Sequence, residues 1–117
     1  MSAFELLDDG STAPERVVSV RVPADCPYFS GHFPHRPILP AIGQLALVAD
    51  LLERAEPGAA WIAGAEALRF VRPILPGDEL TVRIEPALAG EATAFRIERA
   101  GRLVSEGRLR RRRTERR

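Results

Sequence analysis

The stretch PAIGQLALVADLLERA, residues 40–55, decides the fold of this chain. After Pro40 it contains no further proline, and its apolar side chains recur at positions 42, 45, 46, 48, 49 and 52. Apolar residues at this spacing cover most of the circumference of a helix, so the pattern predicts one long helix buried on nearly every side. Pro40 suits the first helical turn, and Pro57 with Gly58 ends the helix.

Outward from this helix, the chain shows the patterns of β-strands. Upstream, residues 16–22 alternate, with Val18, Val20 and Val22 on one side and Pro23 at the end. Downstream, the expected strands are residues 60–73, 79–85, 92–99 and 102–109. The order is therefore one strand, one helix and four strands in a meander. A single helix cannot cover both faces of such a sheet, so we expect an α+β fold in which the sheet curves round the helix.

The length and composition indicate one intracellular domain. A chain of 117 residues has room for one core, which we place at residues 1–110, followed by a basic tail at 111–117 that we expect to be disordered. No run of about 18 residues is free of charge and proline, so no membrane span is predicted. The N-terminus is acidic where a signal peptide is basic, and a single cysteine, Cys26, cannot form an internal disulfide. We expect a cytoplasmic protein.

The charges of the chain are unevenly distributed. All 17 basic residues are arginine, and residues 108–117 hold seven of them with one glutamate. Because the formal net charge is +1, the rest of the chain carries −5. A basic tail can attract an acidic partner. It does not by itself predict nucleic-acid binding, because no aromatic residues are interleaved with the arginines.

The most specific motif lies directly before the helix. It reads Gly31-His32-Phe33-Pro34, then two further residues, Pro37, two apolar residues and Pro40, and a second block follows at residues 69–80, RFVRPILPGDEL. In this order the two blocks closely resemble those of the 3-hydroxyacyl-acyl-carrier-protein dehydratases, and the resemblance covers roughly residues 15–110. The chain thus resembles a dehydratase of fatty-acid or polyketide-type biosynthesis, a lyase of lipid metabolism.

The resemblance carries expectations about architecture and partners. It implies the hotdog fold, a curved antiparallel sheet wrapped around one long helix, and pairing into homodimers, into higher oligomers or into heterodimers with a paralogue. It implies no bound cofactor, since the substrate is a thioester on the phosphopantetheine arm of acyl carrier protein. That arm would pass beside residues 37–41. Exposed arginines such as Arg36, Arg69 and Arg72, or the tail, would dock the acidic carrier.

The resemblance also implies roles for the residues of the motif. His32 matches the family's catalytic histidine, and a neutral imidazole is a suitable base for removing the C2 proton. Phe33, Pro40 and Ala41 would lie along the substrate. The N–H of Ala41, at the start of the helix, would stabilise the charge that develops on the thioester oxygen, although the family has glycine there. A structural histidine is the alternative for His32.

The chain departs from the family at the helix acid. Where the family has Glu or Asp, this sequence has Ala46, which cannot donate a proton. Asp50 lies one turn further on the same helix face and is our candidate for the acid, or else a polar residue near a subunit interface. Gln44 can orient a hydroxyl but cannot act as an acid. With Ala46, it completes the expected substrate-binding residues.

Other functions are open at this point. Without the helix acid, the chain could instead be a non-catalytic acyl-thioester-binding subunit, or half of a heterodimer whose partner supplies the carboxylate. A thioesterase is a third alternative, but that reaction would not need the Gly-His-Phe-Pro loop. His32 and His35 have no third ligand nearby, so we expect no metal site. Cys26 resembles no nucleophile motif and is expected to be a packing residue.

Overall fold

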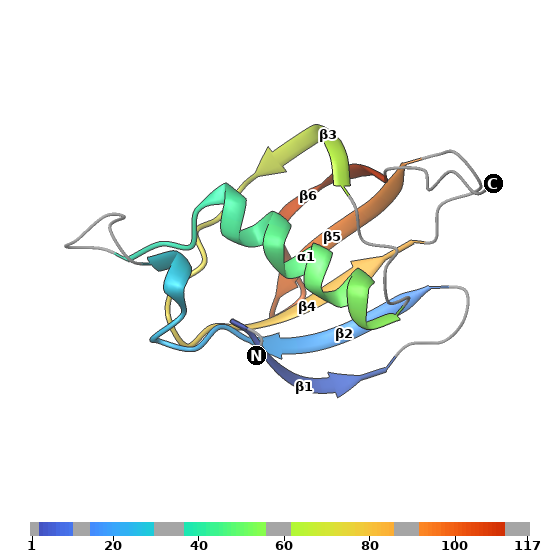
Figure 1. The fold of residues 1–117 in the computed structure, drawn as a ribbon. Coiled ribbons are helices and arrows are strands. Elements are labelled where there is room, and N and C mark those ends of the chain that lie inside the picture. Colours follow the sequence, from blue (N-terminus) through green and yellow to red (C-terminus); the bar gives the residue numbers. More distant parts are fainter. Residues whose placement is uncertain (1–2, 11–14, 30–36, 56–61, 86–91, 112–117) are drawn as a thin grey trace.

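One sheet and one helix make up the described part of the chain. The computed structural model describes residues 3–10, 15–29, 37–55, 62–85 and 92–111. Within these residues, six antiparallel strands form one sheet, and a single α-helix lies across one face of it (Figure 1). The elements are β1 (Glu5–Asp9), β2 (Arg16–Arg21), the 3₁₀ helix η1 (Pro27–Phe29), α1 (Ala41–Ala55), β3 (Ile62–Phe70), β4 (Glu79–Ile84), β5 (Thr93–Arg99) and β6 (Arg102–Arg111).

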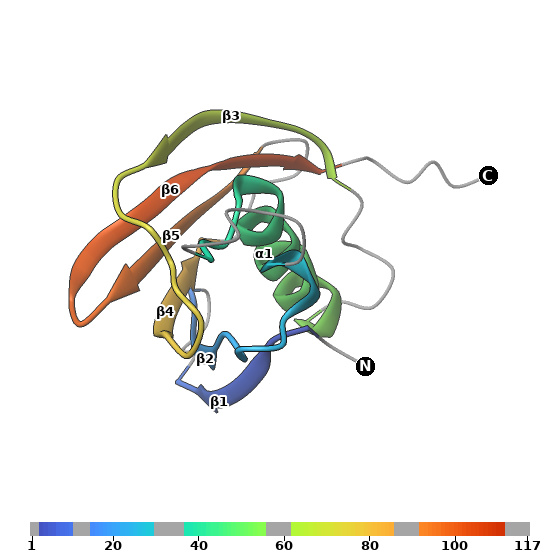
Figure 2. The ribbon, with the colours of Figure 1, turned by 90° about the vertical axis from the view of Figure 1, so that its left-hand side faces the viewer.

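The sheet curves round α1, as the end-on view shows (Figure 2). Part of the curvature comes from β3, whose register with β6 shifts between Glu66 and Arg69. Within this bulge Ala67 has a φ of 55°, a left-handed conformation that residues with a β-carbon rarely adopt. The predicted α+β class and hotdog architecture are confirmed by this arrangement of sheet and helix.

The order of the strands differs from the expected meander. The order across the sheet is β1-β2-β4-β5-β6-β3, so β3 pairs with β6 at the edge, while β2 pairs with β4. Only β4, β5 and β6 form a meander. The prediction of four successive neighbours is therefore wrong, because alternation identifies strands but carries no information about which strands pair.

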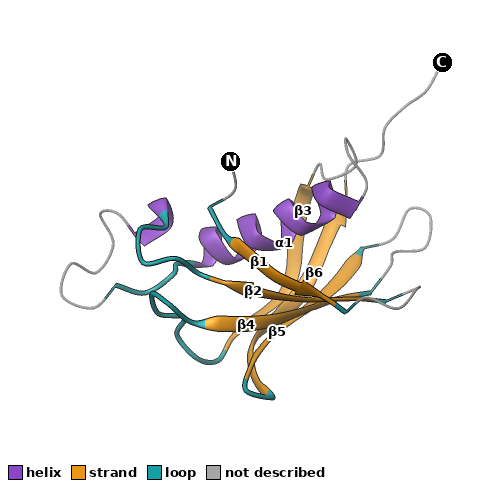
Figure 3. Cartoon of the chain, turned by 90° about the horizontal axis from the view of Figure 1, so that it is seen from below, coloured by secondary structure: helices purple, strands orange, loops and turns teal. Residues whose placement is uncertain are grey.

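The core lies between α1 and the sheet. From the helix, Leu47, Val48 and Leu51 are at most 2% exposed, and from β4 the alternate residues Leu80, Val82 and Ile84 are equally buried. Each such side chain contributes about 1.5–3 kcal/mol on burial. Figure 3, seen from below, shows the helix as a layer on one face of the sheet.

The opposite face of α1 is at least partly exposed, and no described segment of the chain covers it. Ile42 is 67% exposed, and Ala46 and Ala49 are partly exposed. The prediction of a helix buried on nearly every side is therefore wrong for the single chain. The sheet encloses one side of α1 and leaves an apolar stripe on the other.

Strand β1 was not predicted, because its sequence ELLDD does not alternate and all of its residues are exposed. It pairs with β2 at the edge opposite β3. Two ion pairs support it: Arg21 contacts Glu5 at 3.0 Å and Arg16 contacts Asp9 at 3.4 Å. The strand is thus held by backbone pairing and surface charge instead of by apolar burial.

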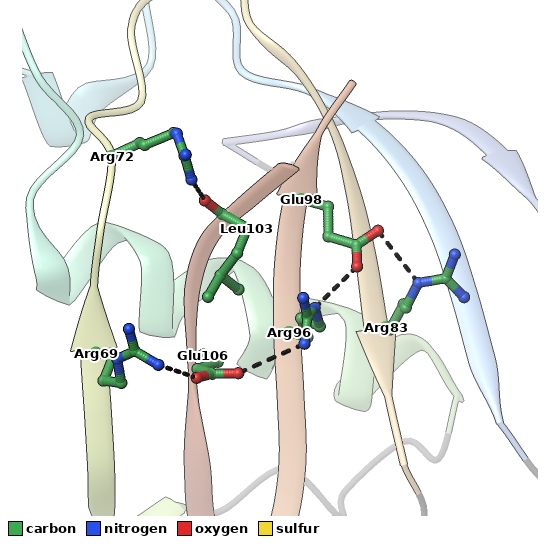
Figure 4. Close-up of polar contacts among 7 residues, drawn as sticks. All are labelled: Arg69, Arg72, Arg83, Arg96, Glu98, Leu103 and Glu106. Atoms are coloured by element: carbon green, nitrogen blue, oxygen red, sulfur yellow. Dashed lines mark hydrogen bonds and ion pairs between the residues drawn. The ribbon is translucent and has the colours of Figure 1, made fainter. Parts of the chain in front are cut away.

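The outer face of the sheet carries a ladder of alternating charges across four strands (Figure 4). Arg69 on β3 contacts Glu106 on β6, which also contacts Arg96 on β5, at 3.1 and 3.8 Å. Glu98 then joins Arg96 and Arg83 at 2.9 and 3.3 Å. Because cross-strand opposite charges stabilise a sheet and remain solvated, this face is polar and internally paired.

The structure also bears on two predictions made from composition, the basic tail and the absence of a membrane-spanning helix. Strand β6 extends to Arg111, the first residue of the expected tail, and residues 112–117 lie outside the described residues. In the described part of the chain, α1 is the longest helix, and no helix has the length and apolar character needed to cross a membrane.

Candidate functional site

The candidate site is built around the first turn of α1. Pro40 begins the helix, because its carbonyl oxygen accepts hydrogen bonds from the N–H groups of Gly43 and Gln44 at 2.9 and 3.1 Å. The N–H of Ala41 has no acceptor among the described residues. Ala41 is also exposed. An unpaired N–H at the positive end of a 15-residue helix is suited to an oxygen that gains negative charge.

Gln44 lies at the inner side of this turn, with only 4% of its surface exposed. Its Nε2 donates a hydrogen bond to the carbonyl oxygen of Leu39 at 3.3 Å. Its Oε1 is buried and has no hydrogen-bond partner among the residues that the structure describes. A buried amide oxygen without a hydrogen-bond donor is unfavourable in free energy. The Gln44 Oε1 is therefore an acceptor that a substrate hydroxyl or a water could use. That availability fits the predicted role of Gln44 in orienting a hydroxyl, which stays a prediction.

Ala46 and Asp50 lie on the uncovered side of α1. Ala46 is partly exposed and brings no polar atom to the site. Asp50, one turn further, is partly exposed, and its Oδ2 accepts a hydrogen bond from Nε of Arg54 at 3.2 Å. The structure thus places Asp50 on the same side as Ala46 but gives its carboxylate an arginine partner.

His32 and Phe33 lie outside the described residues, as do His35 and Arg36. The structure does describe both flanks of their segment. Phe29, at the end of η1, is buried, and the backbone is again described from Pro37 onward. The predicted roles of His32 and Phe33 therefore stay predictions, but the positions at which their segment leaves and rejoins the fold are known.

The two sequence blocks meet in space. The N–H of Leu39, which precedes the helix, donates a hydrogen bond to the carbonyl oxygen of Ile74 in the second block at 2.8 Å. Both side chains are essentially fully buried. The second block thereby holds the chain that leads into the helix N-terminus.

Arg69 and Arg72, which were predicted to dock the carrier protein, already have partners within the chain. Arg69 contacts Glu106, and a guanidinium nitrogen of Arg72 donates to the carbonyl oxygen of Leu103 (Figure 4). Each can still contribute positive charge to the surface. Sequence reasoning gave no sign that these side chains already have partners, because both partners lie more than thirty positions away in the chain.

Cys26 is a buried side chain beside the site. It is 3% exposed, and burial raises the pKa of its thiol, with the backbone of Tyr28 opposing the shift. A protonated thiol is a poor nucleophile, which is consistent with a packing role. Among the described residues, no group of three or more His, Cys, Asp or Glu side chains is placed to hold a metal ion.

Comparison with known proteins adds the family. Residues 9–108, most of the chain, match the ApeI-like family, whose description is ApeI dehydratase. The chain belongs to the ApeI-like dehydratase family. Within that family it is a divergent member, and at the helix position where the resemblance implies an acid it has Ala46.

Curated relatives point to the same chemistry. The 3-hydroxyacyl-acyl-carrier-protein dehydratase FabZ of Polynucleobacter asymbioticus is 45% identical over 73 residues, which is 55% of this chain and 49% of the relative. The FabZ of a Roseiflexus species is 39% identical over 93 residues, covering 71% of this chain and 65% of the relative. This ApeI-like chain spans about half the length of several such relatives.

Solved structures share the fold. The dehydratase heterocomplex ApeI:P from Xenorhabdus doucetiae superposes with a TM-score of 0.82 at 24% identity, covering 92% of this chain and 96% of that one. An uncharacterized protein from Erwinia carotovora subsp. atroseptica gives 0.76 at 24% identity, covering 93% and 95%. At this level of identity the likeness concerns the fold alone.

Proposed function

We propose that this ApeI-like chain dehydrates 3-hydroxyacyl thioesters carried on acyl carrier protein, in the cytoplasm, as part of fatty-acid or polyketide-type biosynthesis. The observation that carries the proposal is the family match over residues 9–108, which includes the Gly-His-Phe-Pro loop and the helix that follows it. The substrate class follows from the names of the FabZ relatives.

The proposed reaction removes a proton from C2 and a hydroxyl group from C3. His32 takes the C2 proton, and the electron pair of the broken C–H bond forms the C2–C3 double bond as the C3–O bond breaks. The hydroxyl group gains a proton and leaves as water. The N–H of Ala41 stabilises the negative charge that develops on the thioester oxygen. The products are the enoyl thioester and one water molecule.

The proton for the leaving hydroxyl needs a donor that Ala46 does not provide. In the single chain, Asp50 is the carboxyl group that lies on the same side of α1 one turn away. Gln44 offers its unpartnered Oε1 to hold the hydroxyl or a water, but it donates no proton as an acid. We assign the acid to Asp50, which shares the uncovered side of α1 with Ala46, whereas Gln44, on the inner side, acts on the hydroxyl through a bound water.

We further propose that the working form contains a second hotdog chain. Strand β3 is an edge of the sheet, and it exposes Leu68, Phe70 and the following Val71 at 36%, 43% and 44%. Unpaired backbone beside apolar side chains is a surface that favours strand pairing. The uncovered stripe of α1, with Ile42 at its start, would also be covered by such a partner.

A second candidate is a subunit that depends on a paralogue for catalysis. The observation that favours it is Ala46 itself, since a partner with an intact helix acid would supply what this chain lacks. The ApeI:P structure, which has the same fold, is a dehydratase heterocomplex, and this supports the alternative. In this alternative the present chain binds acyl carrier protein and stabilises its partner.

One experiment separates the two candidates. Purified protein is incubated with a 3-hydroxyacyl thioester of acyl carrier protein, alone and after co-expression with a co-encoded paralogue, and enoyl formation is followed by absorbance. Dehydration by the isolated chain supports the first proposal, and dehydration only by the mixed complex supports the second. Absence of activity in both preparations contradicts both.

A further inference from the structure

The segment that carries the candidate histidine is tied at both ends to one turn. Before the segment, at the end of β2, the N–H of Val22 donates to the carbonyl oxygen of Asp78 at 2.9 Å, and Gly77 donates back to Val22 at 2.7 Å. After the segment, the N–H of Leu39 donates to Ile74 at 2.8 Å. Residues 74–78 therefore fix both the start and the end of residues 23–38.

The turn is itself closed by the side chain of Asp78. Its Oδ2 accepts a hydrogen bond from the backbone N–H of Leu75 at 2.8 Å, and the N–H of Asp78 donates to the Leu75 carbonyl oxygen at 3.1 Å. Gly77 has a φ of 87°, a conformation that favours glycine, so the tight turn depends on it. The carboxylate thus sets the shape of the turn that holds both flanks.

Arg99, at the end of β5, also contacts this turn. One guanidinium nitrogen, Nη1, donates to Oδ2 of Asp78 at 2.7 Å and to the carbonyl oxygen of Pro73 at 2.8 Å. The side chains of Arg99 and Asp78 are 31% and 21% exposed, so the pair is more protected than most ion pairs of this molecule. Charge-assisted bonds of this length are stronger than neutral ones.

The β5–β6 hairpin presents Arg99 in this position. Arg99 is the last residue of β5, and Ala100 and Gly101 follow with φ values of 52° and 78°. Two successive left-handed residues are typical of a tight two-residue hairpin turn. The hairpin is paired on both sides within the sheet, by β4 and by β3. Arg99 therefore connects the turn at residues 74–78 to a hairpin that is paired with strands on both sides.

We propose that Asp78 and Arg99 are positioning residues of the dehydration reaction. Through the turn they hold Val22 and Leu39, and so they set where the His32 segment leaves β2 and where it enters α1. They also fix Leu39 and Pro40, and with them the direction of the Ala41 N–H. The inference rests on the proposed function, and it adds two residues that do not touch the substrate. Misplacement of a reacting group by about 1 Å can cost about 100-fold in rate.

The test compares three variants with a matched control. Arg99→Ala removes the link, Arg99→Lys keeps a charge that can donate to both acceptors, and Asp78→Asn keeps an acceptor for Leu75 but removes the charge. The control is Arg16→Ala, which removes the ion pair with Asp9 at the end of β2 opposite to Val22, away from the turn. All are assayed well below their melting temperatures in the preparation that dehydrates the substrate.

We expect Arg99→Ala to lower kcat by about 10- to 100-fold with little change in KM, because the reacting groups are displaced while the binding surface remains. Arg99→Lys should recover most of the loss, and Arg16→Ala should stay within about 2-fold of the parent protein. If Arg99 had a purely structural role, Arg99→Ala would lower the melting temperature but leave the turnover of the folded protein unchanged.

Amide hydrogen exchange gives a second readout that does not need activity. In Arg99→Ala, the amides of Val22, Leu39 and Gly77 should exchange faster than in the parent, and those of β4 should not. Unchanged exchange at these amides would show that Arg99 does not hold the turn at residues 74–78 in place. Active protein whose turnover is insensitive to Arg99→Ala overturns the positioning role alone. A parent protein that is inactive with and without its paralogue overturns the proposed function. The positioning role of Asp78 and Arg99 in that reaction is then overturned as well.

Discussion

Gly43 packs directly against Leu39, so closely that a β-carbon on residue 43 would lie 2.7 Å from Cδ1 of Leu39. The same β-carbon would be 3.1 Å from Cβ of Tyr28. A glycine inside a helix is normally unfavourable by about 1 kcal/mol relative to alanine. Here it allows η1 and the chain before the helix to approach α1, which is where the candidate site is built.

We therefore predict that Gly43→Ala destabilises the protein by about 1–3 kcal/mol, because the added β-carbon would meet the buried Leu39 at both Cδ1 and Cγ and force it to shift. The matched control is Gly64→Ala in β3, where an added β-carbon meets nothing within 4 Å and the expected change is within about 0.5 kcal/mol. Urea unfolding of both variants measures the difference. A Gly43→Ala protein as stable as the parent would show that the first turn of α1 is loosely packed.

Restoring a carboxylate at position 46 should raise turnover. Ala46→Glu places an acid on the uncovered side of α1, at the position where the family resemblance implies one, and we expect at least about a 10-fold increase in kcat. The control is Ala49→Glu, which adds the same group less than one turn away at a position that is also partly exposed. Equal gains from both variants would mean that charge, and not position, causes the increase.

The Ala46→Glu variant also allows the role of Asp50 to be tested. If Asp50 replaces the missing acid, Asp50→Asn lowers turnover in the parent by about 10-fold or more and has little effect once Ala46→Glu is present. Stability should change by no more than about 0.5 kcal/mol, since the ion pair with Arg54 is at the helix surface. Steady-state kinetics of the four proteins, with thermal unfolding, give the answer. An unchanged rate for Asp50→Asn in the parent removes Asp50 from the mechanism.

Cys26 should resist thiol reagents in the folded protein. Burial raises the pKa of its thiol, so at about pH 8 labelling should require unfolding. The linked effect on stability has a definite sign: the protonated thiol is favoured by folding, so its contribution is complete below the ordinary thiol pKa and is lost as the pH rises above it. Labelling with an aromatic disulfide, and unfolding of Cys26→Ala at about pH 7 and pH 10, measure both. Rapid labelling of the native protein would contradict the buried position.

Self-association should depend on β3 and not on β1. Phe70 on the β3 edge and Leu6 on the β1 edge are both 43% exposed, which makes them a matched pair. We predict that Phe70→Glu shifts sedimentation toward the monomer, or toward loss of a paralogue complex, because a charge is buried in the new interface. Leu6→Glu should leave assembly unchanged. The reverse result would place the partner on the other edge.

The sequence predicts α1 well, since an apolar run between Pro40 and the Pro57–Gly58 pair leaves no other place for its ends. The strands β2, β4, β5 and β6 also follow from period-two alternation or turn residues. Strand β1 could not be predicted, because backbone pairing and ion pairs hold it without an apolar pattern. The place of β3 beside β6 is a tertiary choice that no local pattern encodes.

The candidate site also has some features that the sequence predicts and others that depend on tertiary packing. Residue types and their spacing indicate His32, Ala41 and the missing acid at Ala46, because these lie within one continuous motif. The inward turn of Gln44 toward Leu39 depends on packing of the preceding loop. The link between Asp78 and Arg99 joins residues 21 positions apart and depends on how the hairpin meets the turn. Such contacts become visible only in three dimensions.

The most direct test of the account compares the two histidines of the loop. His32→Ala and His35→Ala make the same chemical change three residues apart, and enoyl formation from a 3-hydroxyacyl thioester of acyl carrier protein is measured for each in the active preparation. We predict that His32→Ala lowers kcat by about 100-fold or more, whereas His35→Ala stays within about 3-fold of the parent. Full activity of His32→Ala would contradict the assignment of His32 as the base.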